Sequence, residues 1–128
     1  MDKNTRIYYL EKLEELRGSK VLVYFSYTPL DDSILVPLYE QLTQIGRTEK
    51  IDLLLHSYGG AVDTPYKVVM LIREFCNEFG VIVPFVAKSA ASMLVLGADE
   101  VVMGPSSEKG PITTSSAPKT NIEAADLA

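Results

Sequence analysis

The fold prediction starts from one segment, Ile51-Asp52-Leu53-Leu54-Leu55-His56-Ser57-Tyr58-Gly59-Gly60. Its first six residues form a short, mostly apolar run, which is typical of a buried β-strand. Two adjacent glycines follow, and they favour a turn in which bare backbone can approach another segment closely. Residues 62–79 then place apolar side chains at helical spacing. The sequence therefore predicts a strand, a glycine turn and a helix in direct succession.

The same alternation of strands and helices extends in both directions from this stretch. The other expected elements are, in chain order, an amphipathic helix over 5–17, a buried strand over 21–25, a helix from the caps at 31–33 to the residue before Gly46, a strand over 81–86, a short apolar helix to about Gly97 and a strand over 100–103. Residues 113–128 are rich in Thr, Ser, Ala and Pro, and we expect a loop or poorly ordered tail there. The alternation predicts an α/β domain over 1–112 with a mostly parallel sheet.

The composition narrows the classes of function. The chain has 128 residues, a formal charge of −5, one cysteine and one histidine. An acidic chain without a basic cluster is not expected to bind nucleic acid. The few Cys and His residues suggest neither a disulfide nor a zinc site, and we expect no metal and no cofactor. The apolar runs are too short for a membrane-spanning segment and the N-terminus is too polar for a signal peptide, so we expect a cytoplasmic protein.

Chemistry is expected where the predicted strands end. Gly59 and Gly60 follow one strand, and Ser89 follows the next one along the chain. In an open parallel sheet, ligands bind at the carboxyl ends of the strands. A serine beside backbone N–H groups at a helix start can serve as a nucleophile next to an oxyanion hole. Taken separately, however, a glycine pair is also an ordinary turn and Ser89 an ordinary helix cap.

Two motifs make a family resemblance specific. His-Ser-Tyr-Gly-Gly-Ala-Val at 56–62 resembles the Ser-Pro-Gly-Gly-x-Val element of the Clp protease/crotonase superfamily. Ala-Lys-Ser-Ala-Ala-Ser at 87–92, with the segments at 97–105 and 110–112, resembles the nucleophile region of the serine-dehydrogenase-type proteinases, which are relatives of signal peptide peptidase A. The resemblance covers roughly residues 7–112. It implies a Clp/crotonase-like stack of βαβ units, polypeptide substrates and a homo-oligomer.

The resemblance also implies roles for individual residues. Ser89 would be the nucleophile of a serine peptidase, and the backbone N–H groups of Gly60 and Ala90 would form the oxyanion hole. Ser92 competes with Ser89, because the residues around it look like the Ala-Ala-Ser-Met segment of Clp protease. Ser89 follows Gly60 by 29 residues, which resembles the family's separation, and Ser92 lies three residues too far. A crotonase-type acyl-CoA site is disfavoured, because crotonases need no serine at this point.

The base that would activate the serine is less evident. No histidine follows Ser89, so the resemblance excludes a Clp-type Ser-His-Asp triad, and His56 is expected with Gly59 to support the glycine turn. Relatives of signal peptide peptidase use a lysine downstream of the serine, which makes Lys109 and Lys119 candidates, with Lys119 preferred here.

Two departures from the family pattern keep a second hypothesis open. Tyr58 replaces the family's proline, and Thr113 to Ser115 stand where the family has Asp-Pro-Gln. The alternative is a catalytically inactive Clp/crotonase-fold module for oligomerisation or binding.

Overall fold

The computed structural model describes residues 2–105 and 108–109. Its elements are, in chain order, α1 (Lys3–Arg17), β1 (Lys20–Phe25), the 3-10 helix η1 (Asp32–Ile34), α2 (Leu35–Ile45), β2 (Thr48–His56), α3 (Thr64–Arg73), β3 (Cys76–Val83), β4 (Val86–Ala87), α4 (Ala90–Leu96), β5 (Glu100–Met103) and β6 (Glu108–Lys109). Four strands form a parallel sheet in the order β1-β2-β3-β5, and β4 pairs with β6 in a second, two-stranded sheet. The predicted α/β class with a parallel sheet is therefore confirmed.

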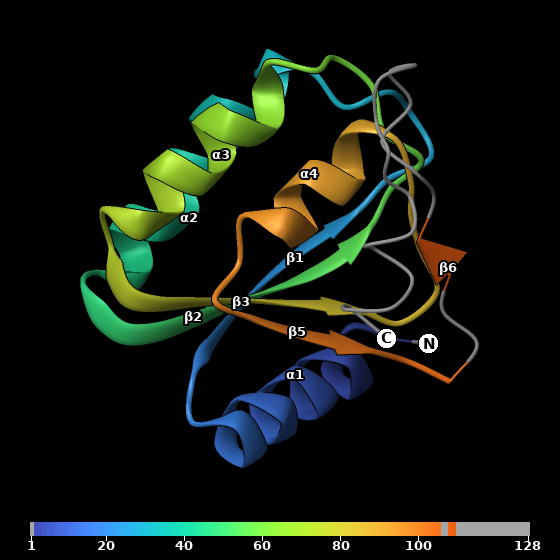
Figure 1. The fold of residues 1–128 in the computed structure, drawn as a ribbon. Coiled ribbons are helices and arrows are strands. Elements are labelled where there is room, and N and C mark those ends of the chain that lie inside the picture. Colours follow the sequence, from blue (N-terminus) through green and yellow to red (C-terminus); the bar gives the residue numbers. More distant parts are fainter. Residues whose placement is uncertain (1, 106–107, 110–128) are drawn as a thin grey trace.

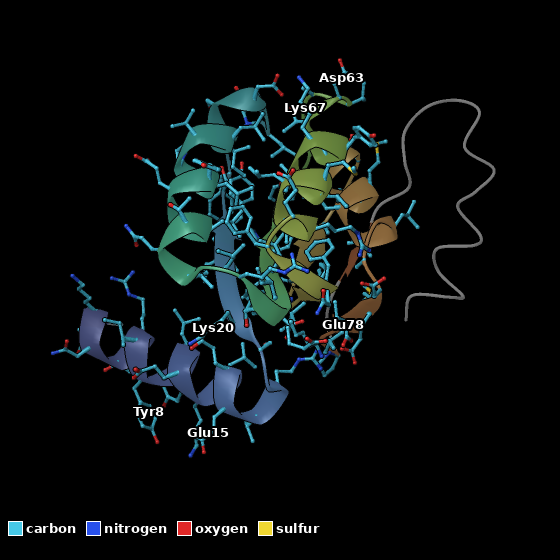
Figure 2. All side chains as sticks on the ribbon, turned by 90° about the vertical axis from the view of Figure 1, so that its left-hand side faces the viewer. Tyr8, Glu15, Lys20, Asp63, Lys67 and Glu78 are labelled. Atoms are coloured by element: carbon cyan, nitrogen blue, oxygen red, sulfur yellow. The ribbon has the colours of Figure 1, made fainter. Side chains whose placement is uncertain are left out.

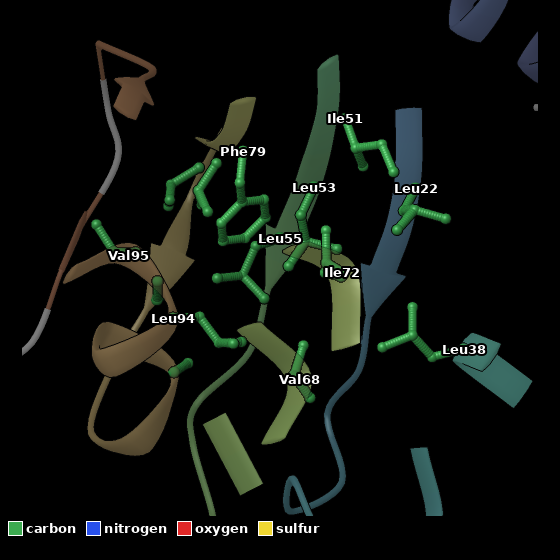
Figure 3. Packing of buried hydrophobic residues seen from close by; sticks show 14 of the residues in the cluster. Leu22, Leu38, Ile51, Leu53, Leu55, Val68, Ile72, Phe79, Leu94 and Val95 are labelled. Carbon is green, nitrogen blue, oxygen red and sulfur yellow. The ribbon is translucent and has the colours of Figure 1, made fainter. Parts of the chain in front are cut away.

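The helices are divided unequally between the two faces of the four-stranded sheet. Figure 1 shows α2, α3 and α4 over one face and α1 beneath the other. The buried core lies under the three helices, where apolar side chains of β1, β2 and β3 meet those of the helices (Figure 3). Leu38 and Leu42 of α2 are buried there, as the helical spacing of that segment predicts. In the described part of the chain, no helix is both long enough and apolar enough to cross a bilayer.

The helix predicted over 62–79 is too long. α3 ends at Arg73, and Cys76 and Phe79 lie on β3, where Thr48 pairs with Cys76 and Ile51 with Phe79. Cys76 and Phe79 continue the apolar spacing of the helix, but they also begin a strand whose residues 79–83 are all buried. The pairing with β2 decides between the two structures. The Cys76 thiol is buried in the core, and burial raises its pKa.

Helix α1 does not bury the apolar face that its sequence presents. It begins earlier than predicted because the Asp2 carboxylate accepts a hydrogen bond from the Thr5 N–H. None of its residues is buried, and Leu16 is 77% exposed. Figure 2 shows Tyr8 and Glu15 pointing away from the rest of the molecule. The helix is instead held at its end, where the Glu14 carboxylate accepts from the Val21 N–H of β1.

A buried carboxylate ties the end of α1 to the sheet. Asp52 of β2 is 0% exposed and accepts hydrogen bonds from the Arg17 guanidinium at 3.0 and 3.2 Å and from the Ser19 hydroxyl at 2.7 Å. Arg17 also donates to Glu100 of β5, and these carboxylates raise its pKa. Gly80 on β3 leaves room for the Asp52 carboxylate, because a Cβ at position 80 would lie 2.2 Å from an Asp52 oxygen. The cluster joins α1, β2 and β5.

We predict that Arg17→Met destabilises the protein by about 3–5 kcal/mol, because it leaves the buried Asp52 charge without its partner. Urea unfolding measures the change. Lys67→Met is the matched control, because its ion pair with Asp32 is exposed to solvent and should contribute far less to stability. Equal losses for the two variants would contradict a structural role for the buried cluster.

Candidate active site

The segments that follow β2 and β3 continue to pair with each other beyond the four-stranded sheet. The Ser57 N–H donates to the Val86 carbonyl, and the Lys88 N–H donates to the Ser57 carbonyl, both at 3.1 Å. This pairing continues β2 into the glycine turn and β3 into β4. It places the residues after Ser57 beside those after Ala87, which are the two motifs that the sequence singled out.

The two glycines fit where no other residue would. Gly59 has φ +100°, and a Cβ on it would lie 2.6 Å from Ser89 Cβ and 2.9 Å from Ala90 N. A Cβ on Gly60 would lie 2.2 Å from the Leu30 carbonyl oxygen. The Ser57 hydroxyl accepts a 3.0 Å hydrogen bond from the Gly59 N–H and so fixes the turn. The glycine pair therefore does more than reverse the chain direction. It allows the backbone of the turn to contact the segments at Ser89 and at Leu30 closely.

Ser89 sits in a strained conformation at the start of α4. Its φ of 54° and ψ of −128° make it the one non-glycine residue with positive φ in the described part of the chain. Such backbone geometry costs on the order of 1–3 kcal/mol and persists where the surroundings enforce it. Its hydroxyl does not cap α4. A serine at a sharp strand-to-helix turn is how α/β-hydrolases expose their nucleophile.

In the part of the chain that the structure describes, two backbone N–H groups beside the contact of Gly59 with Ser89 have no acceptor. Among the described residues, neither Gly60 nor Ala90 donates a hydrogen bond through its backbone N–H. The bridge to Leu30 uses the carbonyl of Gly59 and the N–H of Ala61, so the Gly60 N–H is not consumed by it. Ala90 is the first residue of α4. An N–H pair of this kind can bind an anionic oxygen.

Ser92, the competing serine, has a structural contact. It is 1% exposed, and its hydroxyl donates to the Ala87 carbonyl at 3.1 Å. The bond ties α4 back to β4 from inside the core. Ser89 is half-buried and directly precedes the same helix.

His56 lies in an environment that the sequence did not reveal. It is 5% exposed, and neither ring nitrogen has a hydrogen-bond partner among the described residues. Phe25 stacks on the imidazole at 5.1 Å between centroids, and Tyr27, Tyr58 and Phe85 pack around it at 5.2, 5.7 and 6.4 Å. Any support that His56 gives the glycine turn is therefore through ring packing. The hydrogen bond that fixes the turn comes from Ser57, a role that sequence reasoning missed.

The candidate bases are not placed beside Ser89 by the structure. Lys119 and the tail over 113–128 lie outside the described residues, and for Lys109 only the backbone pairing in β6 is described. Carboxylate partners raise the pKa of Lys50 and of Lys67, which is the opposite of what a general base needs. No group of three or more potential metal ligands occurs among the described residues.

Two solved structures of ClpP proteases have a similar fold. The structure of the ClpP1 N165D mutant from Listeria monocytogenes matches with a TM-score of 0.51 at 19% identity, covering 70% of this chain and 51% of that one. The ClpP protease catalytic domain from Plasmodium falciparum matches with a TM-score of 0.57 at 12% identity, covering 80% and 61%. The chain has a Clp/crotonase-like fold. At this level of identity the likeness concerns the fold alone.

Sequence comparison finds relatives without a named activity. The uncharacterized proteins MJ1495 and MJ0137 of Methanocaldococcus jannaschii are 25% and 24% identical to this chain over 84% of its length. The chain spans 41% and 42% of those two proteins. No protein-family model matches it.

We predict that Ser89→Gly raises the free energy of unfolding by about 1 kcal/mol, because glycine adopts positive φ without strain. Thermal and urea unfolding measure the change. Ser92→Gly is the matched control on the same helix, and it should lower stability because it removes a buried hydrogen bond and places glycine inside α4. Destabilisation of similar size in both variants would contradict the strained geometry of Ser89.

Proposed function

We propose that this chain carries a serine peptidase site in which Ser89 is the nucleophile and the N–H groups of Gly60 and Ala90 form the oxyanion hole. The observation that carries the proposal is the positive φ of Ser89 in direct contact with Gly59. A structural helix cap would need neither the strain nor the glycine contact. The N–H groups of Gly60 and Ala90, which have no acceptor among the described residues, supply the donors that acyl transfer requires.

The proposed reaction is acyl transfer in two steps. The Ser89 Oγ attacks the carbonyl carbon of a peptide bond while a base removes its proton, and the carbonyl oxygen becomes an oxyanion held by the two N–H groups. The intermediate collapses as the same proton passes to the leaving amine, which gives an acyl-serine. Water then releases the acid and restores the hydroxyl. Loss of one oxyanion donor typically lowers the rate by ~10²–10³.

We assign the base to Lys119, as in peptidases of the serine-dehydrogenase-type proteinase and signal peptide peptidase A type. An uncharged lysine amine can take the serine proton, and burial or neighbouring charge must lower its pKa for that role. The proposal extends to unfolded or small polypeptides as substrates, to a homo-oligomer and to a cytoplasmic location. The ClpP proteases with this fold support the choice of a peptidase over other hydrolases.

The second candidate is a catalytically inactive module of the same fold. The features that favour it are the absence of an identified base beside Ser89 in the described residues and the two unpaired nitrogens of His56. Such a module would keep the glycine contact and the strained serine as structural features. It would bind partners without cleaving them.

We predict that a fluorophosphonate probe forms a covalent adduct with one probe per chain, because an activated serine hydroxyl displaces the fluoride. Intact-mass spectrometry detects the adduct, and peptide mapping should place it on Ser89. Ser89→Ala should abolish labelling, whereas Ser92→Ala should change its rate less than about threefold, since the Ser92 side chain is buried and its hydroxyl donates to the Ala87 carbonyl. Absence of an adduct, or an adduct on Ser92, would contradict the proposed nucleophile.

We predict that Lys119→Met slows labelling of Ser89 by about 100-fold or more, which is the usual contribution of a general base. The rate in the unsubstituted protein should rise with pH as the lysine loses its proton. Lys109→Met is the matched control and should retain the rate within about threefold. Slow labelling in Lys109→Met with full labelling in Lys119→Met would reassign the base.

A further inference from the structure

The outer edge of β1 carries backbone groups that have no partner among the described residues. β1 is the edge strand of the sheet and pairs only with β2 among the described residues. The Ser26 N–H, directly after the strand, donates to the His56 carbonyl on the β2 side, and the Val21 N–H points outward to the Glu14 carboxylate. Because backbone direction alternates along a strand, the N–H and C=O groups of Val23 and Phe25 also face outward. An exposed strand edge of this kind is a template for another strand.

A cavity of about 410 Å³ opens along the same edge. That volume lies within the range of ligand pockets, roughly 300–1,000 Å³. Its floor is apolar and is formed by Leu22, Leu38, Leu53, Val68 and Leu94, which face one another beneath α2 and α3 (Figure 3). Its rim is polar and comes from the segment after β1 and from α2, at Ser26, Thr28, Asp31, Ser33 and Gln41. The cavity can take an apolar side chain whose backbone stays outside.

Acidic side chains lie at both ends of the β1 edge and favour some polypeptide partners over others. Asp31 lies on the rim, where it accepts hydrogen bonds from the Ser33 N–H and hydroxyl, and the Ser33 hydroxyl lowers its pKa. Glu14 lies at the other end of the edge. The chain as a whole has a charge of −5. Lysine or arginine residues would complement this surface, and acidic residues would be repelled.

We propose that the outer edge of β1 binds an extended polypeptide that adds a strand to the sheet, places apolar side chains in the cavity and carries basic residues at its flanks. Backbone hydrogen bonds to Val23 and Phe25 would supply affinity, and the cavity would supply side-chain selectivity, as in other cases of strand addition. The inference goes beyond the proposed peptidase site and does not require Ser89 to be reactive. The segment that follows β1 bridges at Leu30 to Gly60, so the edge leads towards the proposed oxyanion hole.

The test uses the full chain with Ser89→Ala, so that binding is measured without cleavage. The probe is the peptide Lys-Thr-Leu-Thr-Leu-Lys with an N-terminal fluorescein, followed by fluorescence anisotropy. Two further peptides are N-methylated, one at both leucines and one at both threonines. Only one of these two sets of N–H groups can face β1 in a bound strand. We expect one pattern to weaken binding at least tenfold and the other to change it less than threefold.

Further peptides and variants locate the site. A peptide with glutamates in place of the lysines should bind at least fivefold more weakly. Asp31→Asn, which keeps an oxygen for the η1 cap, should weaken the lysine peptide at least threefold, and Glu74→Gln at the end of α3 is the matched control. Amide hydrogen exchange at Val23 and Phe25 should slow when the peptide is bound. Equal effects of the two N-methylation patterns, or no binding, would overturn strand addition even if Ser89 proves to be the nucleophile.

Discussion

The close approach of two backbones, at Gly59 and Ser89, is the constraint on which the site depends. β2 and β3 run parallel and side by side, and the two hydrogen bonds of Ser57 carry that pairing beyond the sheet. The glycine turn is thereby pressed against the start of α4, where a Cβ on Gly59 would clash with Ser89. The packing of α4 into the core through Ala90, Ala91, Leu94 and Val95 holds the other side of this contact. Strain at Ser89 is thus maintained by the same core that stabilises the fold.

Parts of this arrangement follow from the sequence, because they depend on neighbours along the chain. The apolar run before Gly59 predicts a buried strand, and adjacent parallel strands bring Gly60 and Ser89 to one edge of the sheet. The end of α3 could not be predicted, because Cys76 and Phe79 satisfy both helical spacing and a buried strand, and only pairing with β2 decides. The exposure of α1 could not be predicted either, because an apolar helix face does not specify which segment covers it.

The contacts of His56 could not be predicted from the sequence, although this residue belongs to one of the two motifs. Four aromatic rings from three separate segments pack around the imidazole, and no local pattern predicts that they meet. The Ser57 hydroxyl was missed for a related reason, because a serine before two glycines reads as part of the turn and not as the group that fixes it. The free edge of β1 likewise follows only from the strand order. The site and the edge are joined through the Leu30–Gly60 bridge.

The central claim is that Ser89 acts together with the N–H groups of Gly60 and Ala90. A crystal structure of the chain after reaction with a fluorophosphonate measures this most directly, because the phosphoryl oxygen stands in for the oxyanion of the tetrahedral intermediate. We predict that the phosphorus is bonded to Ser89 Oγ and that the phosphoryl oxygen lies within about 2.7–3.1 Å of both backbone nitrogens. An oxygen that points to solvent, with both N–H groups turned away from it, would contradict the account even if Ser89 carries the label.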